Sequence, residues 1–203
     1  VKGAALKAKG VNMAIGDYYN HDSLVAAMQG VNTLLLISSS SLTSRYEQHA
    51  RVIKAAKESS VGHIVYTSII RSSPATKFTA GIAHAQTEAD IKTSGMAYTI
   101  MGNTYYTEYL PMVLGNFKET GIIYYSAGDA GINFAWRTDM AEANAVVLSN
   151  PSAHQNKVYD ITSSKAFTFH DIAAIVSGIV GKPIQYADIP LAALKKGMLD
   201  HGL

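Results

Sequence analysis

The clearest pattern of hydrophobic and polar positions lies in the stretch Thr33–Ser41. An unbroken apolar run, Leu34–Ile37, is followed directly by four serines, Ser38–Ser41. A short apolar run bounded by polar turn residues predicts a strand buried on both faces, and such strands belong to parallel sheets that helices cover on both sides. We therefore expect the serines at the carboxyl end of a central strand, where open α/β sheets bind their ligands.

Strand-like and helix-like segments alternate through the first half of the chain. The expected strands are Val11–Ile15, Leu34–Ile37, Ile64–Thr67 and Ala97–Met101. The expected helices are Ala4–Lys9, a segment capped by Asp22 or Ser23 that ends at Gln29, Arg45–Ser59 and Ala83–Thr93, with a loop over residues 74–81. This alternation is typical of βαβ units and predicts a parallel sheet.

The pattern is looser after Asn103. Helices are expected at Tyr105–Lys118 around Pro111, at Thr138–Ser149 with Thr138 or Asp139 as cap, and at Thr168–Val180. Short strands are expected at Gly121–Tyr125, at Val158–Ile161 and from Pro183 to Tyr186, and Ala127–Ile132 reads as a loop.

Composition excludes several classes of protein. The 203 residues carry a net charge of +2 with no basic stripe, which argues against nucleic acid as a partner. The chain has no cysteine, so disulfides, thiol catalysis and cysteine-ligated metal sites are excluded, and a reducing cytoplasm fits. No apolar run approaches the ~20 residues that span a membrane, and no signal-peptide pattern opens the chain. The length suits one sizeable core with a small satellite domain.

An ordered series of segments resembles the NmrA-like family of atypical short-chain dehydrogenase-like proteins. The segments are GDYYNHDSLVAAMQGV, LLLISSSS, IVYTSII, HAQTEADIKTSGMAYTIMGNTYYTEY, RTDMAEANAVVL and FTFHDIAAIVSGIVGKPIQY. The resemblance implies a Rossmann-like, doubly wound parallel sheet that binds NADP(H) in residues 1–103. It also implies a smaller carboxyl-terminal α/β substrate region in residues 104–203, of which about residues 136–162 return to the first domain.

Two cofactor motifs of the family do not occur in this sequence. The family has a GxxGxxG-type loop after its first strand and an Arg after its second strand that binds the 2′-phosphate, whereas this chain opens on a helix tail. We therefore expect that the first two strands of the sheet, and the segment beyond the abrupt carboxyl end, lie outside these residues. A protein of these residues alone should not bind NADPH tightly, and micromolar binding would contradict this expectation.

The resemblance places cofactor contacts after the first three strands of the family match. Ser38, Ser39 and Ser40 would lie beside the ribose and phosphates, and the alternative is a polar loop after a strand. Asp17, with Tyr18 beside it, would lie near the adenine, and the alternative is a turn residue that satisfies local backbone groups. Thr67 and Ser68 end the strand where short-chain dehydrogenases keep their catalytic serine.

The segment GNTYYT matches the cofactor segment after the next strand. Its residues are Gly102, Asn103, Thr104, Tyr105, Tyr106 and Thr107. The family commonly has Arg-Asn-Gly or Arg-Pro-Gly here, so Asn103 agrees, whereas Gly102 and Thr104 depart from the pattern. Tyr105 and Tyr106 can wall a flat pocket for nicotinamide and a planar acceptor, and the alternative is that they pack a domain interface.

The catalytic pair of short-chain dehydrogenases, Tyr-x-x-x-Lys, is absent, because no tyrosine of this chain has a lysine four residues later. His84 and Glu88 lie one turn apart and match the family's H-x-x-T-E segment. A histidine with an ordinary pKa of about 6.5 could donate a proton, and the alternative is a pair that orients its helix. A metal site is not expected here, because the sequence offers no further metal ligands near this pair. Arg137 and Asp139 resemble a structural R-x-D element.

Without an acid–base pair, the expected reaction is hydride transfer from NADPH to a quinone. A quinone suits this site because the hydroquinone anion is stabilised by delocalisation and can take its proton from solvent. Tyr105, Tyr106 and His84 are the candidates for contact with the acceptor. Two alternatives stay open: another flat acceptor such as an azo compound, and a non-catalytic NADP(H)-binding redox regulator of the NmrA type. The expected partners are a small planar acceptor and a second copy of the chain in a homodimer.

Overall fold

The computed structural model describes residues 3–200, which form two compact units. The first unit contains the residues up to Asn103 together with Glu142–Asp160, and the second contains Thr104–Ala141 together with the residues from Ile161 onward. Helix α7 (Arg137–Ser149) begins in the second unit and continues into the first.

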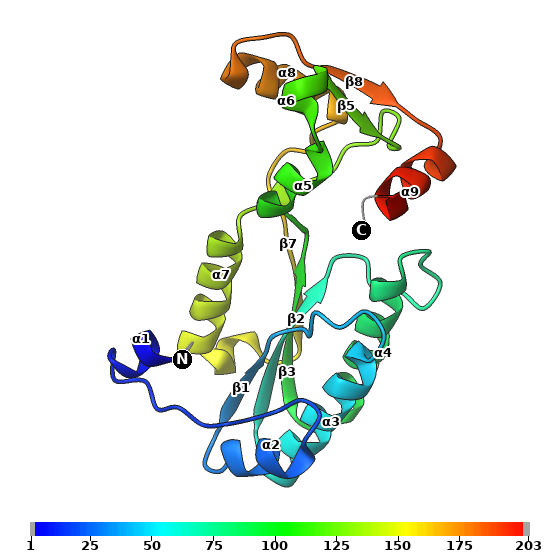
Figure 1. Cartoon of the computed structure of the whole chain (residues 1–203). Coiled ribbons are helices and arrows are strands. Elements are labelled where there is room, and N and C mark those ends of the chain that lie inside the picture. Colours follow the sequence, from blue (N-terminus) through cyan, green and yellow to red (C-terminus); the bar gives the residue numbers. More distant parts are fainter. Residues whose placement is uncertain (1–2, 201–203) are drawn as a thin grey trace. The chain divides into compact units, whose positions relative to one another are not determined.

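A parallel sheet organises the first unit (Figure 1). Its strands are β1 (Thr33–Leu36), β2 (His63–Ile69), β3 (Ala97–Asn103) and β7 (Lys157–Ile161), in the order β1-β2-β3-β7. The three strands β1, β2 and β3 run parallel, with Leu36 opposite Tyr66 and Tyr66 opposite Ile100. The α/β fold with a parallel sheet is therefore confirmed.

Helices α3 (Arg45–Glu58) and α4 (Thr79–Thr93) connect the strands β1, β2 and β3, and the shorter helices α1 (Ala4–Lys7) and α2 (His21–Ala27) precede β1. A 3₁₀ turn, η2, lies at Pro151–His154. Helix α3 contacts α2 and α4. Apolar side chains from these helices and from the strands, including Val52, Ile64, Ile91 and Ile100, form one buried cluster. Burial of such side chains stabilises the fold by about 1.5–3 kcal/mol each.

One strand expectation for the first unit is wrong. Val11–Ile15 forms no strand, and Ile15 is 88% exposed; an extended segment becomes a strand only when a neighbouring strand accepts and donates its backbone hydrogen bonds. The strand expected at Leu34–Ile37 forms as β1, at the edge of the described sheet, but its expected burial is seen only at Leu36, and Ile37 after it is 61% exposed. The strand buried along most of its length is β2, in which the first six residues are all buried.

Two helix boundaries also differ from the expectation. Helix α2 is capped by Asn20, whose side-chain oxygen accepts the amide proton of Ser23 at 3.1 Å. Neither Asp22 nor Ser23 is the cap, because both lie inside the first turn. Helix α4 begins at Thr79, within the expected loop over residues 74–81.

Two small parallel strand pairs belong to the second unit. Strand β4 (Tyr105–Tyr106) pairs with β6 (Phe134–Ala135), and β5 (Ile122–Tyr125) pairs with β8 (Gln185–Asp188). The helices are η1 (Thr107–Tyr109), α5 (Leu110–Leu114), α6 (Phe117–Thr120), α8 (Phe169–Val180) and α9 (Leu191–Asp200).

The core of the second unit is built around Phe169 at the start of α8. Its ring stacks on Tyr125 from β5, with ring centroids 4.5 Å apart, and on Tyr186 from β8, at 5.4 Å. Leu114, Ile123 and further apolar side chains complete this cluster. The second unit therefore has a hydrophobic core of its own.

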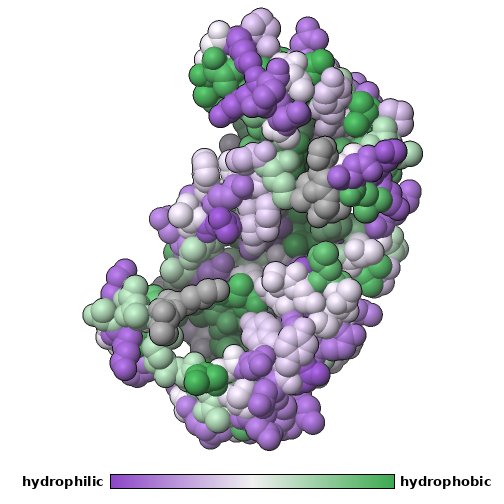
Figure 2. Space-filling model, viewed as in Figure 1, coloured by the Kyte–Doolittle hydropathy of each residue, from purple (hydrophilic) through white to green (hydrophobic). Residues whose placement is uncertain are grey.

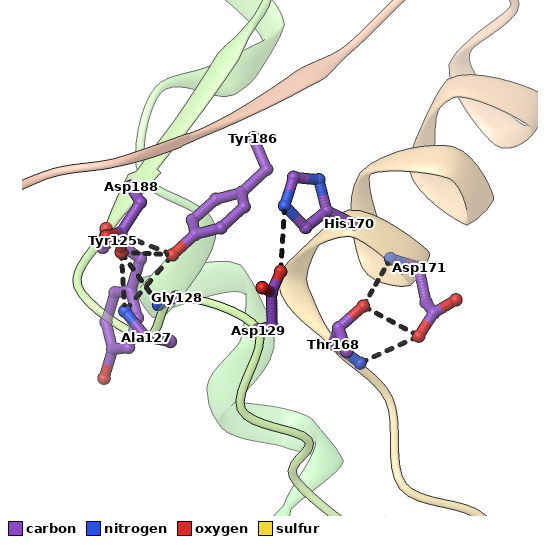
Figure 3. Close-up of polar contacts among 9 residues, drawn as sticks. All are labelled: Tyr125, Ala127, Gly128, Asp129, Thr168, His170, Asp171, Tyr186 and Asp188. Atoms are coloured by element: carbon purple, nitrogen blue, oxygen red, sulfur yellow. Dashed lines mark hydrogen bonds and ion pairs between the residues drawn. The ribbon is translucent and has the colours of Figure 1, made fainter.

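A carboxylate holds the loop after β5 in place (Figure 3). Asp188 Oδ1 accepts the backbone amide protons of Ala127 at 3.0 Å and Gly128 at 2.8 Å, and the hydroxyl proton of Tyr186 at 2.7 Å. These donors lower the pKa of Asp188 below its ordinary value, the Gly128 amide most. The turn-rich loop Ala127–Ile132 is thus ordered by a residue about sixty positions later.

The expected helix Tyr105–Lys118 is wrong, because strand β4, η1 and two short helices occupy this segment. Pro111 lies in the first turn of α5, where its missing amide proton costs nothing. Gly115 ends α5 with a φ of 60°, a value that non-glycine residues rarely adopt. Helix α7 begins at Arg137, so both expected caps, Thr138 and Asp139, lie inside its first turn, and α9 was not expected.

The described surface mixes apolar and polar residues. Figure 2 shows hydrophobic residues in separate groups among hydrophilic ones on the face in view. None of the helices in residues 3–200 is both long and apolar enough to cross a bilayer.

Candidate functional site

Three neighbouring strand ends of the first unit meet at one edge of the sheet. Ser38, just beyond β1, donates its backbone amide proton to Thr67 Oγ1 at the end of β2, at 2.9 Å. Ser68 of β2 lies opposite Gly102 of β3, and the next residue of β2 lies opposite Asn103. Five of the residues expected to bind the cofactor are thereby brought together: Ser38, Thr67, Ser68, Gly102 and Asn103.

The serine loop Ser38–Ser41 is tied to helix α3. Ser39 donates its backbone amide proton to Nε2 of His49 at 2.9 Å, and its hydroxyl donates to Oε1 of Gln48. Its carbonyl accepts from Nε of Arg45 at 2.7 Å. The hydroxyl and backbone of Ser39 are therefore engaged within the protein, whereas Ser40 is exposed.

A buried polar cluster lies beneath this loop. The Tyr66 hydroxyl is 2.7 Å from Nδ1 of His84 and 3.3 Å from Nδ1 of His49. Thr87 of helix α4 joins the cluster, with Oγ1 at 3.0 Å from Nδ1 of His49. These four side chains come from α3, β2 and α4, and all are buried.

Burial sets the protonation of this cluster. It lowers the pKa of His84 to about 4, with a further contribution from the charge of Arg45, and it likewise lowers the pKa of His49 to about 4. Burial also raises the pKa of Tyr66 above its ordinary value. The expectation that His84 titrates near 6.5 is therefore wrong: the side chain is neutral at physiological pH.

Glu88 does not pair with His84, although the two lie one turn apart on α4. Glu88 Oε1 accepts hydroxyl protons from Ser68 and from Ser72, each at 2.6 Å, and its other oxygen lies 3.2 Å from Nζ of Lys92. Glu88 thus fastens the end of β2 and the loop after it to the helix.

Asp17 forms a local turn on the surface. Its carboxylate accepts the amide proton of Tyr19 at 2.9 Å, and its own amide proton goes to the hydroxyl of Ser23 at 2.9 Å. Tyr18 donates its hydroxyl proton to the carbonyl of Ile37, at 3.0 Å. These bonds are what the turn interpretation of Asp17 predicts, and they place Tyr18 beside the serine loop.

Gly102 faces a crowded space between strands. A Cβ added there would lie 2.9 Å from Oδ1 of Asp160 and 3.3 Å from the carbonyl of Tyr159, both on β7. Close strand packing explains why glycine occupies this position, where the family commonly has arginine. Whether Gly102 also contacts a cofactor stays a prediction.

The remaining expected site residues lie in the second unit. Thr104 is buried and donates its hydroxyl proton to the carbonyl of Asn133 at 2.6 Å. Tyr105 is half exposed and meets Phe134 edge to face, and Tyr106 stacks on Tyr109 with ring centroids 5.7 Å apart. The two expected aromatic residues therefore belong to an aromatic surface, and their contact with a ligand stays a prediction.

An apolar cavity of about 490 Å³ in the second unit was not expected from the sequence. Thr107 lies on its wall, together with Phe134 and Trp136, and helix α8 supplies an aliphatic side. Its volume falls within the range of small-molecule pockets. Its lining residues are Thr107, Leu110, Leu114, Phe134, Ala135, Trp136, Asp139, Ile161, Thr162, Ser163, Phe167, Ile172, Ile175, Val176 and Ile179.

Glu108 holds the first residue of α7, and the structural role that the resemblance gives to Arg137 and Asp139 stays a prediction. The Arg137 amide proton goes to Oε1 of Glu108 at 3.0 Å, and its Nε lies 3.5 Å from the same oxygen. Asp139 lies on the wall of the apolar cavity. Within residues 3–200, no three histidine, aspartate or glutamate side chains are grouped as a metal site requires.

The buried partners of His84 were missed, although one signal for them was present. His49 lies three and four residues before Val52 and Ile53, so it shares the buried face of α3. A histidine on such a face needs polar partners inside the protein. Nothing in the sequence identifies Tyr66 and Thr87 as those partners.

Comparison with known proteins places the chain among NADPH-dependent reductases. It is 36% identical over 208 residues to quinone oxidoreductase 2 of Escherichia coli (strain K12), covering 100% of this chain and 71% of that protein. It is 27% identical over 202 residues to NAD(P)H azoreductase of Xenophilus azovorans, covering 100% of this chain and 70% of that protein.

A solved structure agrees with these relatives. The NADPH complex of the E. coli NADPH-dependent quinone oxidoreductase superposes with a TM-score of 0.91 at 35% identity, covering 100% of this chain and 71% of that one. The NmrA-like family matches residues 2–202. With the sheet, the serine loop and the whole-length similarity in agreement, this chain belongs to the NmrA-like family.

Proposed function

We propose that this chain belongs to an NADPH-dependent oxidoreductase that transfers hydride to a quinone or a similar planar acceptor. The observation that carries the proposal is the similarity along the whole chain to a quinone oxidoreductase whose structure is known with NADPH. The azoreductase relative supports the wider acceptor class, because quinones and azo compounds are both planar and conjugated.

NADP(H) fits the edge formed by the three strand ends of the first unit. Ser38 and Ser40 are small residues there, and serine hydroxyls can bond sugar and phosphate oxygens. The Ser68 hydroxyl already donates to Glu88 and the space at Gly102 is filled by β7, so these two residues would contribute through their place at the strand ends. The hydroxyl of Ser39 is engaged with Gln48, so Ser39 would act through its position rather than through its side chain. When bound, the cofactor would supply a hydride.

Asp17, Thr67 and Asn103 complete the proposed cofactor set in the first unit, and Thr104 and Thr107 extend it along the chain. Thr67 is occupied by the amide proton of Ser38, so its hydroxyl holds the serine loop in position for a ligand. Asp17 is exposed beside Tyr18 and would meet the adenine end.

Flat aromatic rings are the proposed contact for the acceptor. Tyr105 is half exposed, and Tyr106 stacks in parallel on Tyr109 with an interplanar angle of 10°. An aromatic face that already accepts one parallel ring suits a planar conjugated molecule.

The acid–base groups of the first unit favour an acceptor that needs no strong acid. His84 is neutral at physiological pH, and the pKa of Tyr66 is raised, so neither donates a proton readily. A quinone accepts two electrons with the hydride and can then take its proton from solvent. Ordinary carbonyl reduction requires an acid beside the oxygen, and no tyrosine–lysine pair exists here.

The test is oxidation of NADPH by the full-length protein, followed by the loss of NADPH absorbance with a panel of quinones and azo dyes. We expect acceptor-dependent oxidation. The variants Tyr105→Ala and Tyr106→Ala should raise KM for the quinone between about 2-fold and 10-fold, the value of one lost aromatic contact. Tyr124→Ala, an exposed tyrosine on β5, is the control and should leave KM unchanged.

NADPH binding without oxidation of NADPH by any acceptor would overturn the enzyme proposal. It would instead favour the non-catalytic, redox-sensing alternative. Absence of NADPH binding by the full-length protein would overturn the cofactor assignment itself.

A further inference from the structure

Two buried histidines on either side of a tyrosine form the most constrained polar group in the first unit. His49 comes from α3, Tyr66 from β2 and His84 from α4, and their exposed fractions are 0%, 0% and 4%. The Tyr66 ring centroid lies 5.4 Å from that of His49 and 5.7 Å from that of His84. A neutral histidine carries a proton on only one ring nitrogen, and its hydrogen-bond partners determine which one.

The backbone decides the answer for His49. A backbone amide can only donate, so Nε2 of His49, which lies 2.9 Å from the amide nitrogen of Ser39, must be an acceptor without a proton. A neutral His49 therefore carries its proton on Nδ1. Thr87 Oγ1, 3.0 Å away, can accept that proton because its own hydroxyl proton goes to the carbonyl of Ala83 at 2.8 Å.

The protonated Nδ1 of His49 in turn orients Tyr66. The Tyr66 oxygen lies 3.3 Å from that nitrogen and can only accept there. Its own proton is thus available to Nδ1 of His84, at 2.7 Å, the shortest bond in the cluster. Ser68 lies 3.5 Å from the same nitrogen, but its hydroxyl proton goes to Glu88 at 2.6 Å.

We propose that a directed chain of hydrogen bonds, from the Ser39 amide through His49 and Tyr66, holds His84 in the neutral tautomer with its proton on Nε2. Tyr66 is the positioning residue of this chain. The serine loop at the end of β1 thereby determines which nitrogen of a helix α4 histidine can donate.

Protonation of His84 would work against this arrangement. An added proton on Nδ1 would point at the Tyr66 oxygen, which already accepts from His49 and whose own proton would lose its acceptor. Burial opposes the charge as well, since it lowers the pKa of both histidines. His84 therefore offers an N–H hydrogen bond rather than an acidic proton, and, if the proposed function holds, this is what it can offer an acceptor.

The chemical shifts of the histidine side-chain nitrogens report this series of hydrogen bonds directly. Long-range ¹H–¹⁵N correlation spectra of the uniformly ¹⁵N-labelled chain at neutral pH distinguish the two neutral tautomers by the shifts of Nδ1 and Nε2. We expect opposite tautomers in the two buried histidines: Nδ1–H in His49 and Nε2–H in His84. His84 with its proton on Nδ1, or both histidines in the same tautomer, would overturn the proposal.

The variant Tyr66→Phe removes the hydroxyl that links the two histidines. We expect His84 to lose its pure Nε2–H pattern and move toward a mixture of tautomers, while His49 keeps Nδ1–H through Ser39 and Thr87. Unchanged His84 shifts in this variant would show that Tyr66 does not position it.

Two controls separate this link from a general disturbance of the core. Thr87→Val removes a buried hydroxyl from the same cluster but leaves the bond between Tyr66 and His84, so the His84 tautomer should not change. His63 serves as an internal reference: its Nε2 donates to Thr99 Oγ1 at 2.9 Å, because the Thr99 proton goes to the carbonyl of His154. If Thr87→Val shifts His84 as much as Tyr66→Phe does, or if His63 shifts in Tyr66→Phe, the specific link is refuted. The tautomers can be read without any activity, so this test fails or succeeds independently of the proposed function.

Discussion

His49 and His84 sit almost fully buried beside the same tyrosine, and burial lowers the pKa of both to about 4. In an unfolded chain their pKa returns to about 6.5. Between these values the unfolded state binds more protons than the folded state, so stability rises with pH across this window. The stability that the two neutral histidines contribute is fully present above pH ~6.5 and is lost as the pH falls toward about 4.

Unfolding by denaturant should therefore show a falling free energy of unfolding from pH 6.5 to pH 5. A pKa that is lowered from 6.5 to about 4 reduces the free energy of unfolding by on the order of 3 kcal/mol per histidine once the pH is below both values. Asp171 and Asp188, whose pKa values are lowered, add their own loss only at lower pH. His49→Gln should reduce the slope, and a slope equal to that of the unsubstituted chain would contradict the assignment.

The crowding at Gly102 should make even a small side chain at this position destabilising. Gly102→Ala should lower the free energy of unfolding by about 1 kcal/mol, the low end of the cost of overpacking. The Asp160 side chain is exposed and can turn away, but the Tyr159 carbonyl, 3.3 Å from the added carbon, belongs to the backbone of β7.

The matched control for this substitution is Gly62→Ala. The nearest atom to an added carbon there is the Asn32 carbonyl at 3.6 Å, an ordinary contact, and its φ is not positive. Equal destabilisation by the two substitutions in chemical denaturation would argue against crowding between β3 and β7.

At the scale of elements, the stability of helix α8 depends on the residues that cap its start. Thr168 Oγ1 accepts the amide proton of Asp171 at 3.1 Å, while the Asp171 carboxylate accepts the amide proton of Thr168 at 2.9 Å, which together form a capping box (Figure 3). The cap matters for the second unit because it lies next to Phe169, the centre of that unit's core.

Thr168→Ala should lower the free energy of unfolding of the second unit by about 1 kcal/mol through loss of the cap. Thr168→Ser keeps the hydroxyl and should remain close to the unsubstituted chain. Amide hydrogen exchange along α8 measures both, and equal protection in the Ala and Ser variants would show that the hydroxyl does not stabilise the helix.

For the whole molecule, the separate cores are the main feature. The chain passes between the two units after Asn103, after Ala141 and after Asp160. The apolar cluster around Ile64 and Ile100 shares no residue with the cluster around Phe169 and Ile123.

Phe169→Ala should therefore act mainly on the second unit. Loss of a buried phenylalanine costs about 3–5 kcal/mol, and we expect amide protection to fall in α8, β5 and β8 while β2 and β3 keep theirs. Ile64→Ala is the reciprocal variant. Uniform loss of protection throughout the chain in both variants would indicate a single cooperative unit instead.

The sequence by itself determined the features that depend on neighbours along the chain. The alternation of apolar strands and helices predicted the parallel sheet, and the helix expected at Thr168–Val180 forms as α8 with Thr168 as its cap. Helix periodicity, caps and turns are set by a few consecutive residues and can be read from them.

Only the tertiary structure decided the features that depend on residues far apart in sequence. It placed β1 at the edge of the described sheet, left Val11–Ile15 without a strand partner and broke Tyr105–Lys118 into short elements. It also brought Tyr66 between His49 and His84, which decides their charge and the position of their protons. Burial and hydrogen-bond partners across 17 or 18 positions are properties of the fold, so no local pattern around TLLLISSSS could reveal what its backbone holds in place.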